Sequence, residues 1–128
     1  MARLDIYKCN ACGQVVEIAA DAGLVPSCCG MEMELMTPQT AEYKLEKHVP
    51  YPEAMAQGTR VLVGKETAHP MTEEHQILWI EIINGQYVNR KYLKPGEKPE
   101  AEFYVPLQEG MIVREYCNLH GLWEYVVE

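Results

Sequence analysis

The sequence is poor in positive charge. It contains 11 lysines and arginines against 19 aspartates and glutamates, which gives a formal net charge of -8 at pH 7. Proteins that bind nucleic acids concentrate lysine and arginine against the phosphate backbone. The composition therefore argues against a nucleic-acid partner.

Long apolar runs are also lacking. No run approaches the stretch of about 20 apolar residues that spans a membrane, and the opening residues MARLDIYKCN have no apolar core like that of a signal peptide. We therefore expect a cytoplasmic protein with no membrane partner. Hydrophobic residues make up 48% of the 128 residues, which is typical of a globular chain of one domain, or of a small domain joined to a medium one.

Cysteine is scarce, and its number is odd. Four of the five cysteines lie in the first 37 residues, as a CxxC pair (Cys9 and Cys12) and a vicinal pair (Cys28 and Cys29). A two-residue gap allows a turn to direct both sulfurs at one ion, whereas a disulfide between adjacent residues is strained. This pattern predicts a tetrahedral site of four thiolates, which suits zinc and iron equally well.

The composition changes along the chain, and we expect two domains, residues 1–37 and residues 38–128. The first contains short predicted strands at Tyr7–Lys8 and Gln14–Ile18, and a domain this small usually needs a staple such as a metal. The second alternates short β-like runs with turn signals such as Asn84-Gly85 and Glu109-Gly110, which is typical of an antiparallel β-sandwich. The predicted fold class is all-β. The β-like runs of the second domain are RVLVG, HQILWIEIING, QYVNRKYL, AEFYVPL, MIVREYC and LWEYVVE.

Histidine is equally scarce, and all four histidines lie in the second domain with the isolated Cys117: His48, His69, His75 and His120. One histidine alone is more often a surface residue than a ligand. Four imidazoles and one thiolate together are too rich in nitrogen for a structural zinc site. On a metal that accepts six ligands they would leave one position open, and a thiolate would push electron density through the metal. Such a site suits the binding and reduction of a small oxygen species.

Several other readings of these residues are open. A blue-copper protein also has a late cysteine near a histidine, but four histidines exceed its need and no methionine follows His120. A zinc-stapled binding module leaves the four histidines unexplained. An iron protein that only transfers electrons or senses redox state is the main alternative to an enzyme. Trp79 and Trp123 lie in strand-like runs and are expected to serve packing.

Five short motifs, in order, resemble desulfoferrodoxin, the two-iron form of superoxide reductase. They are CNAC, SCCG, EKHVP, AHPM…EEH and CNLHG, and they span nearly the whole chain. The resemblance implies one iron held by the four cysteines in a desulforedoxin-like, or rubredoxin-like, domain. It implies a second iron in an immunoglobulin-like sandwich, with His48, His69, His75 and His120 equatorial and Cys117 axial.

The resemblance also implies a role for the two residues before His48. Lys47 would steer superoxide and assist proton delivery, and Glu46 would occupy the open position once the iron is ferric. The implied reaction is the one-electron reduction of superoxide to hydrogen peroxide. A homodimer and a small electron donor such as rubredoxin are implied as well. A local positive field at the second iron would explain how an acidic protein attracts an anion, since distant carboxylates are screened beyond about 8 Å at physiological salt.

Overall fold

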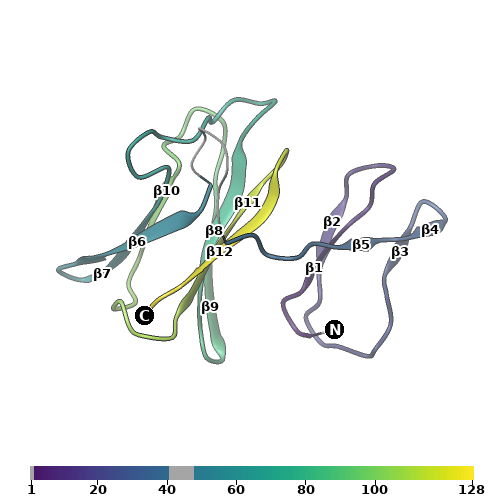
Figure 1. Cartoon of the computed structure of the whole chain (residues 1–128), viewed down its shortest axis with the longest axis horizontal. Helices are drawn as coiled ribbons and strands as arrows, with labels where there is room; N and C mark the ends of the chain where they lie inside the picture. Colours follow the sequence, from purple (N-terminus) through teal and green to yellow (C-terminus); the bar gives the residue numbers. More distant parts are fainter. Residues whose placement is uncertain (1, 41–47) are drawn as a thin grey trace. The chain divides into compact units, whose positions relative to one another are not determined.

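The computed structural model describes residues 2–40 and 48–128. Within these ranges the secondary structure consists of twelve β-strands without a helix, which confirms the all-β prediction. No helix capable of crossing a membrane occurs in the described part of the chain. By their internal contacts the residues divide into two compact units, Met1–Thr37 and Pro38–Glu128, drawn in Figure 1.

The smaller unit is built from five very short strands. Three of them form an antiparallel sheet in the order β2-β1-β5, and the other two form a hairpin. Its buried centre contains Tyr7, Cys9 and Met33, so one of its three buried side chains is a potential metal ligand. The strands are β1 (Ile6–Lys8), β2 (Val15–Glu17), β3 (Ser27–Cys28), β4 (Met31–Glu32) and β5 (Glu34–Leu35).

The larger unit is a sandwich of two antiparallel sheets, of order β10-β7-β6 and β12-β11-β8-β9. Alternate side chains of the central strands, such as Val61, Ile80, Ile82 and Val113, form one buried cluster, as expected where one face of each sheet meets the core. The predicted β-sandwich is therefore confirmed. Its strands are β6 (Pro50–Met55), β7 (Gly58–Val63), β8 (Ile77–Asn84), β9 (Tyr87–Tyr92), β10 (Glu100–Phe103), β11 (Ile112–Cys117) and β12 (Gly121–Val126).

Strand β6 was not among the strands expected from the sequence. It contains Pro50 and Pro52, which pair with Val63 and Val61 of β7. Proline cannot donate a hydrogen bond to a neighbouring strand, and it is tolerated mainly in edge strands. β6 is an edge strand of its sheet, and this position, which the sequence pattern does not reveal, makes the prolines acceptable.

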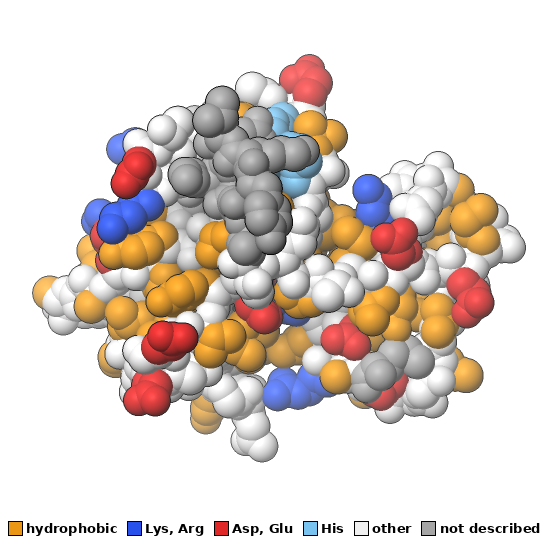
Figure 2. Space-filling model, in the orientation of Figure 1, with side chains coloured by type: hydrophobic (Ala, Val, Ile, Leu, Met, Phe, Trp, Pro, Cys, Tyr) orange, Lys and Arg blue, Asp and Glu red, His pale blue; other side chains and the backbone are white. Residues whose placement is uncertain are grey.

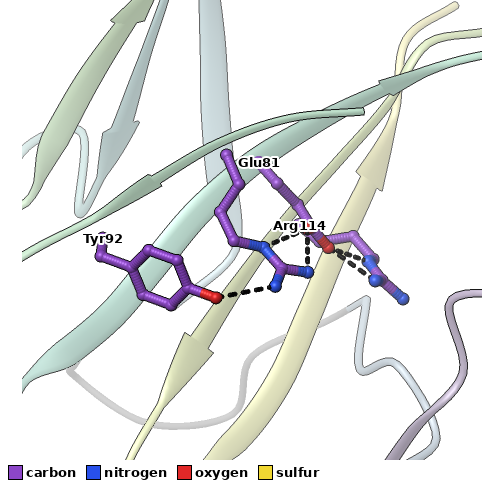
Figure 3. A network of polar contacts seen from close by, with 4 residues as sticks. Glu81, Tyr92 and Arg114 are labelled. Atoms are coloured by element: carbon purple, nitrogen blue, oxygen red, sulfur yellow. Dashed lines mark hydrogen bonds and ion pairs between the residues drawn. The ribbon is translucent and has the colours of Figure 1, made fainter. Parts of the chain in front are cut away.

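The face of β8 opposite the core carries a buried carboxylate, Glu81, between two arginines (Figure 3). Arg90 of β9 donates to one carboxylate oxygen at 2.6 and 2.8 Å. Arg114 of β11 donates to the other at 2.6 Å. Arg90 also donates to the Tyr92 hydroxyl at 3.0 Å. These bonds join three neighbouring strands, and they satisfy a carboxylate that is fully removed from solvent.

Candidate metal centres

All four histidines and Cys117 meet at one end of the sandwich. Cys117 is the last residue of β11 and pairs with Ile77, the first residue of β8. His69 and His75 lie in the connection that leads into β8, and His120 lies in the short turn between β11 and β12. His48 lies two residues before β6. The antiparallel pairing of β8 with β11 therefore brings together residues that are far apart in the sequence.

The four imidazoles form a closed ring. Neighbouring ring centroids are 4.6 to 5.1 Å apart and neighbouring planes are inclined by 67° to 80°, in the order His48, His69, His75, His120. Across the ring, His48 and His75 are 6.4 Å apart and inclined by 34°. The longer distance across the ring is that of a square, in which four nitrogens can approach one ion from the four sides.

The potential ligand atoms are close enough to share one ion. One nitrogen or sulfur from each of the five residues lies within 4.8 Å of every other. His120 Nδ1 is 2.9 Å from His48 Nε2, and the Cys117 sulfur is 3.6 Å from His69 Nε2 and 3.8 Å from His120 Nδ1. Ligands bonded to one ion at about 2.0 to 2.3 Å are separated by such distances.

The second nitrogen of His69 is already engaged. Its Nδ1 lies 2.8 Å from the Pro70 carbonyl oxygen, a geometry in which Nδ1–H donates to that oxygen. Nε2 then carries the lone pair and faces the Cys117 sulfur. Such a backbone partner orients a metal-binding imidazole and sets its tautomer.

The residues of the cluster differ in their burial. His48, His69 and Cys117 are 2%, 3% and 0% exposed, and Cys117 belongs to the apolar core of the sandwich. His75 and His120 are half-buried, and Figure 2 shows histidine atoms at the surface of the larger unit. The sulfur therefore approaches from the core, while two of the imidazoles lie nearer the surface of the unit.

Asn118 ties the two loops of this cluster together. Its side-chain amide donates to the Glu74 carbonyl at 3.0 Å, and its side-chain oxygen accepts from the Gln76 backbone N–H at 2.8 Å. Its backbone N–H donates to the Gln76 carbonyl at 3.1 Å. These bonds hold the residues on both sides of His75, so that the loop after Cys117 positions the loop that carries His75.

A glycine allows the chain to place His69. Gly64 has a φ of +82°, and a Cβ atom there would lie 2.1 Å from the Thr67 carbonyl oxygen and 2.8 Å from the His69 nitrogen. The His69 backbone N–H donates to the Val63 carbonyl at 3.2 Å. The absence of a side chain at position 64 therefore permits the tight return of the chain that brings His69 to the cluster.

The second cluster consists of the four cysteines of the smaller unit, whose sulfurs lie within 4.8 Å of one another. The Cys28 sulfur is 3.6 Å from that of Cys12 and 3.9 Å from that of Cys29. Cys28 pairs with Met31, and the turn between them has positive φ angles at both Cys29 (53°) and Gly30 (74°), as in a type I′ hairpin. This turn allows adjacent cysteines to direct their sulfurs to the same point.

The thiols of this cluster affect one another's ionisation. The pKa of Cys9 is lowered to about 6, mainly because the Cys12 backbone N–H donates to its sulfur, although burial opposes the shift. The pKa of Cys28 is raised to about 12, first by its contact with the Cys9 sulfur and then by Cys12. The pKa of Cys29 is also raised, mainly by Cys12. Four sulfurs this close can all be thiolates only around a cation.

All nine potential ligands expected from the sequence thus lie in two clusters of four and five. Glu46 and Lys47 lie outside the described residues. Reasoning from the sequence alone did not identify Asn118, whose hydrogen bonds hold the loop of His75. The asparagine stands inside the CNLHG motif, which is the one signal that could have indicated it.

Comparison with known proteins covers both units. A sequence model described as "Desulfoferrodoxin" matches residues 40–126, and one described as "Desulfoferrodoxin, N-terminal domain" matches residues 1–36. A desulfoferrodoxin homolog of Methanothermobacter thermautotrophicus is 48% identical over 92% of this chain and 94% of its own. A desulfoferrodoxin of Nitratidesulfovibrio vulgaris is 47% identical over 94% of both chains. The crystal structure of the superoxide reductase from Treponema pallidum superposes with a TM-score of 0.73 at 28% identity, covering 95% of this chain and 97% of the other.

Proposed function

This chain belongs to the desulfoferrodoxin family, and we propose that it is a superoxide reductase. The overall reaction consumes one superoxide, one electron from an external donor and two protons, and releases one hydrogen peroxide. The relative from Pyrococcus abyssi named superoxide reductase is 35% identical over 72% of this chain. Its match supports the same activity here.

The observation that carries this proposal is the square of four imidazoles with one buried cysteine sulfur. Five ligands of this composition fit iron, which accepts six, and do not fit a closed tetrahedral zinc site. Iron held by His48, His69, His75, His120 and Cys117 would supply the electron and an open coordination position for superoxide. The chain supplies the arrangement of the ligands and the burial of the sulfur.

Lys47 and Glu46 are proposed to act on the anion and on the open position, respectively. A lysine directly before His48 would place a positive charge near the histidine cluster, where it would attract superoxide and assist proton delivery. Glu46 would be drawn to the open position more strongly once the metal is ferric. Replacement Lys47→Ala should slow superoxide capture and reduce its salt dependence, and an unchanged rate in pulse radiolysis would contradict steering.

The four cysteines are proposed to hold a second iron, with residues 1–37 as its domain and residues 38–128 as the domain of the catalytic iron. The donor is proposed to be a small rubredoxin-like protein, and the assembly a homodimer. A cytoplasmic location is proposed as well, since the cysteine spacing favours metal binding over a disulfide framework.

The test combines metal analysis with superoxide kinetics on full-length protein purified without oxygen. We expect two irons per chain, and rapid oxidation of the histidine-bound iron by superoxide with release of peroxide. Cys117→Ser should remove the thiolate-to-iron absorption of this centre and spare that of the four-cysteine centre, and Cys28→Ser should do the reverse. An iron-loaded protein that exchanges electrons but leaves superoxide unconsumed would instead be an electron carrier or sensor.

A further inference from the structure

Trp123 contacts two of the four histidines in two different ways. Its ring stacks on His48 with centroids 4.8 Å apart and planes inclined by 13°. Its Nε1–H donates to the backbone carbonyl of His120 at 3.1 Å. The indole is 6% exposed. Trp123 therefore contacts His48 by the face of its ring and the backbone of His120 by its polar edge.

Gln39 donates to the same carbonyl oxygen. Its side-chain Nε2 lies 2.6 Å from the oxygen of His120. The backbone of Gln39 is held along β12, where its N–H donates to Leu122 at 3.0 Å and its carbonyl accepts from Glu124 at 2.9 Å. Gln39 is thus anchored on both sides of Trp123, and both donors converge on one oxygen, which has two lone pairs to accept them.

The residue held in this way lies in a short turn. Only three residues connect Cys117 to Gly121, which pair with each other at the ends of β11 and β12. In so short a turn, the orientation of the His120 peptide plane determines where its imidazole leaves the backbone. Two hydrogen bonds to the carbonyl hold that plane, and the stacked indole limits rotation of the His48 ring beside it.

We propose that Trp123 and Gln39 are positioning residues that hold His48 and His120 in place for metal binding. The inference deepens the proposed function, since it concerns the same cluster and rests on the proposed metal site. It assigns to Trp123 a role beyond the packing expected from the sequence. Neither residue is a ligand, so the expected effect is on the retention and the spectrum of the metal and not on the number of ligands.

The chain offers a matched control for Trp123. Trp79 is the only other tryptophan and has the same exposed fraction, 6%. Its described ring contacts are with Tyr116, Tyr92 and Arg90, not with a histidine. Trp123→Phe retains an aromatic face but removes the N–H donor. Trp79→Phe makes the same chemical change at a ring whose N–H has no hydrogen-bond partner among the described residues.

The experiment measures iron affinity in full-length protein by competition with a chelator, after removal and restoration of iron without oxygen. Loss of one supporting contact typically weakens metal binding by about 10- to 100-fold. We expect a loss of this size at the histidine centre for Trp123→Phe, with a shifted thiolate-to-iron absorption band. Trp79→Phe should leave both unchanged. Equal iron affinity and equal spectra in the two variants would overturn the proposal.

Gln39 provides a second test that does not depend on a buried substitution. Gln39 is exposed, so Gln39→Glu should fold normally while a carboxylate, which cannot donate, replaces the amide beside the His120 carbonyl. We expect Gln39→Glu to retain iron less well than Gln39→Ala. Gln57→Glu is the control and should retain iron normally, because it adds the same charge at an exposed site in the turn between β6 and β7. Unchanged retention in Gln39→Glu would refute the role of Gln39. If wild-type protein retains iron normally but does not reduce superoxide, the proposed function is contradicted and the positioning roles are not.

Discussion

Asn118 separates two potential ligands in the sequence, yet its side chain contacts the loop that carries a third. Its hydrogen bonds to Glu74 and Gln76 bracket His75, and Thr72 supports the same loop by accepting from the His75 backbone N–H at 3.1 Å. Ligand geometry in this protein therefore depends on residues that do not bind metal. The same principle applies to Trp123 and Gln39 at His48 and His120.

Replacing Asn118 should loosen the histidine centre. Asn118→Ala removes both side-chain bonds, and we expect iron to be held about 10-fold less tightly or worse, as measured by chelator competition. Asn118→Asp retains the acceptor for Gln76 but loses the donor to Glu74, so its effect should be intermediate. Asn89→Ala, in β9, is the control. Wild-type affinity in Asn118→Ala would show that the loops hold their positions without this residue.

The thiols of the smaller unit should make its metal affinity depend on pH. At neutral pH the pKa values place Cys9, at about 6, mostly in the thiolate form and Cys28, at about 12, in the thiol form. Metal binding must displace the proton of Cys28, so affinity should fall as pH decreases, by about tenfold per released proton for each pH unit. Competition for zinc between pH 8 and pH 6 measures this slope. An affinity independent of pH would mean that the thiols are already ionised.

At the scale of strands, β8 organises both faces of the larger unit. Ile80 and Ile82 face the core, and Glu81 between them faces Arg90 and Arg114 on the neighbouring strands. The same strand begins at Ile77, beside Cys117. The ion pairs on one face therefore help to maintain the strand pairing that brings Cys117 to the loop of His75.

Removing the charge of Glu81 should be costly. Glu81→Gln leaves two guanidinium groups facing a neutral amide in a buried position, and breaking such a network typically costs about 3 to 5 kcal/mol. Urea unfolding followed by tryptophan fluorescence measures the free energy of unfolding. Glu102→Gln is the control, because Glu102 pairs with Arg60 at 3.2 Å with its side chain 61% exposed, and it should cost about 1 kcal/mol or less. Similar losses in both variants would argue against a special role for Glu81.

At the scale of the whole molecule, the two units differ in how much apolar material they bury. The buried cluster of the sandwich contains twelve residues, whereas the described cluster of the smaller unit contains Tyr7, Cys9 and Met33. A unit of this size rarely folds on apolar burial alone and usually needs a metal or disulfides. The metal of the four-cysteine cluster is therefore expected to stabilise the fold of its unit, in addition to any redox chemistry that it performs.

Metal removal should affect the two units unequally. With a strong chelator under reducing conditions, amide protons of β1 and β2 should lose their protection against hydrogen exchange, since the bound metal contributes most of the folding free energy of the smaller unit. Amides of β8 and β11 should remain protected, because the sandwich has its own core. Retained protection in β1 after complete metal loss would show that the smaller unit folds without metal.

The sequence by itself determined the chemistry available to this protein. The CxxC pair, the vicinal cysteines and the four histidines grouped with Cys117 predicted two metal sites, because ligand type and local spacing are covalent properties of the chain. Alternation of apolar residues and turn signals predicted the β-sandwich for the same reason. The edge strand β6 was missed, since local propensity disfavours its two prolines and only the position in the sheet makes them acceptable.

The tertiary structure alone decided how these residues are arranged. The burial of the Cys117 sulfur belongs to the packed core. The contacts of Asn118 with Gln76, of Gln39 with His120 and of Trp123 with His48 join segments that are distant in the sequence. Such contacts depend on strand pairing and packing across the sandwich, which no local pattern encodes. The chain supplied the ligands. The antiparallel pairing of β8 with β11, together with the packing of β6 against β11 and β12, brought them to one point.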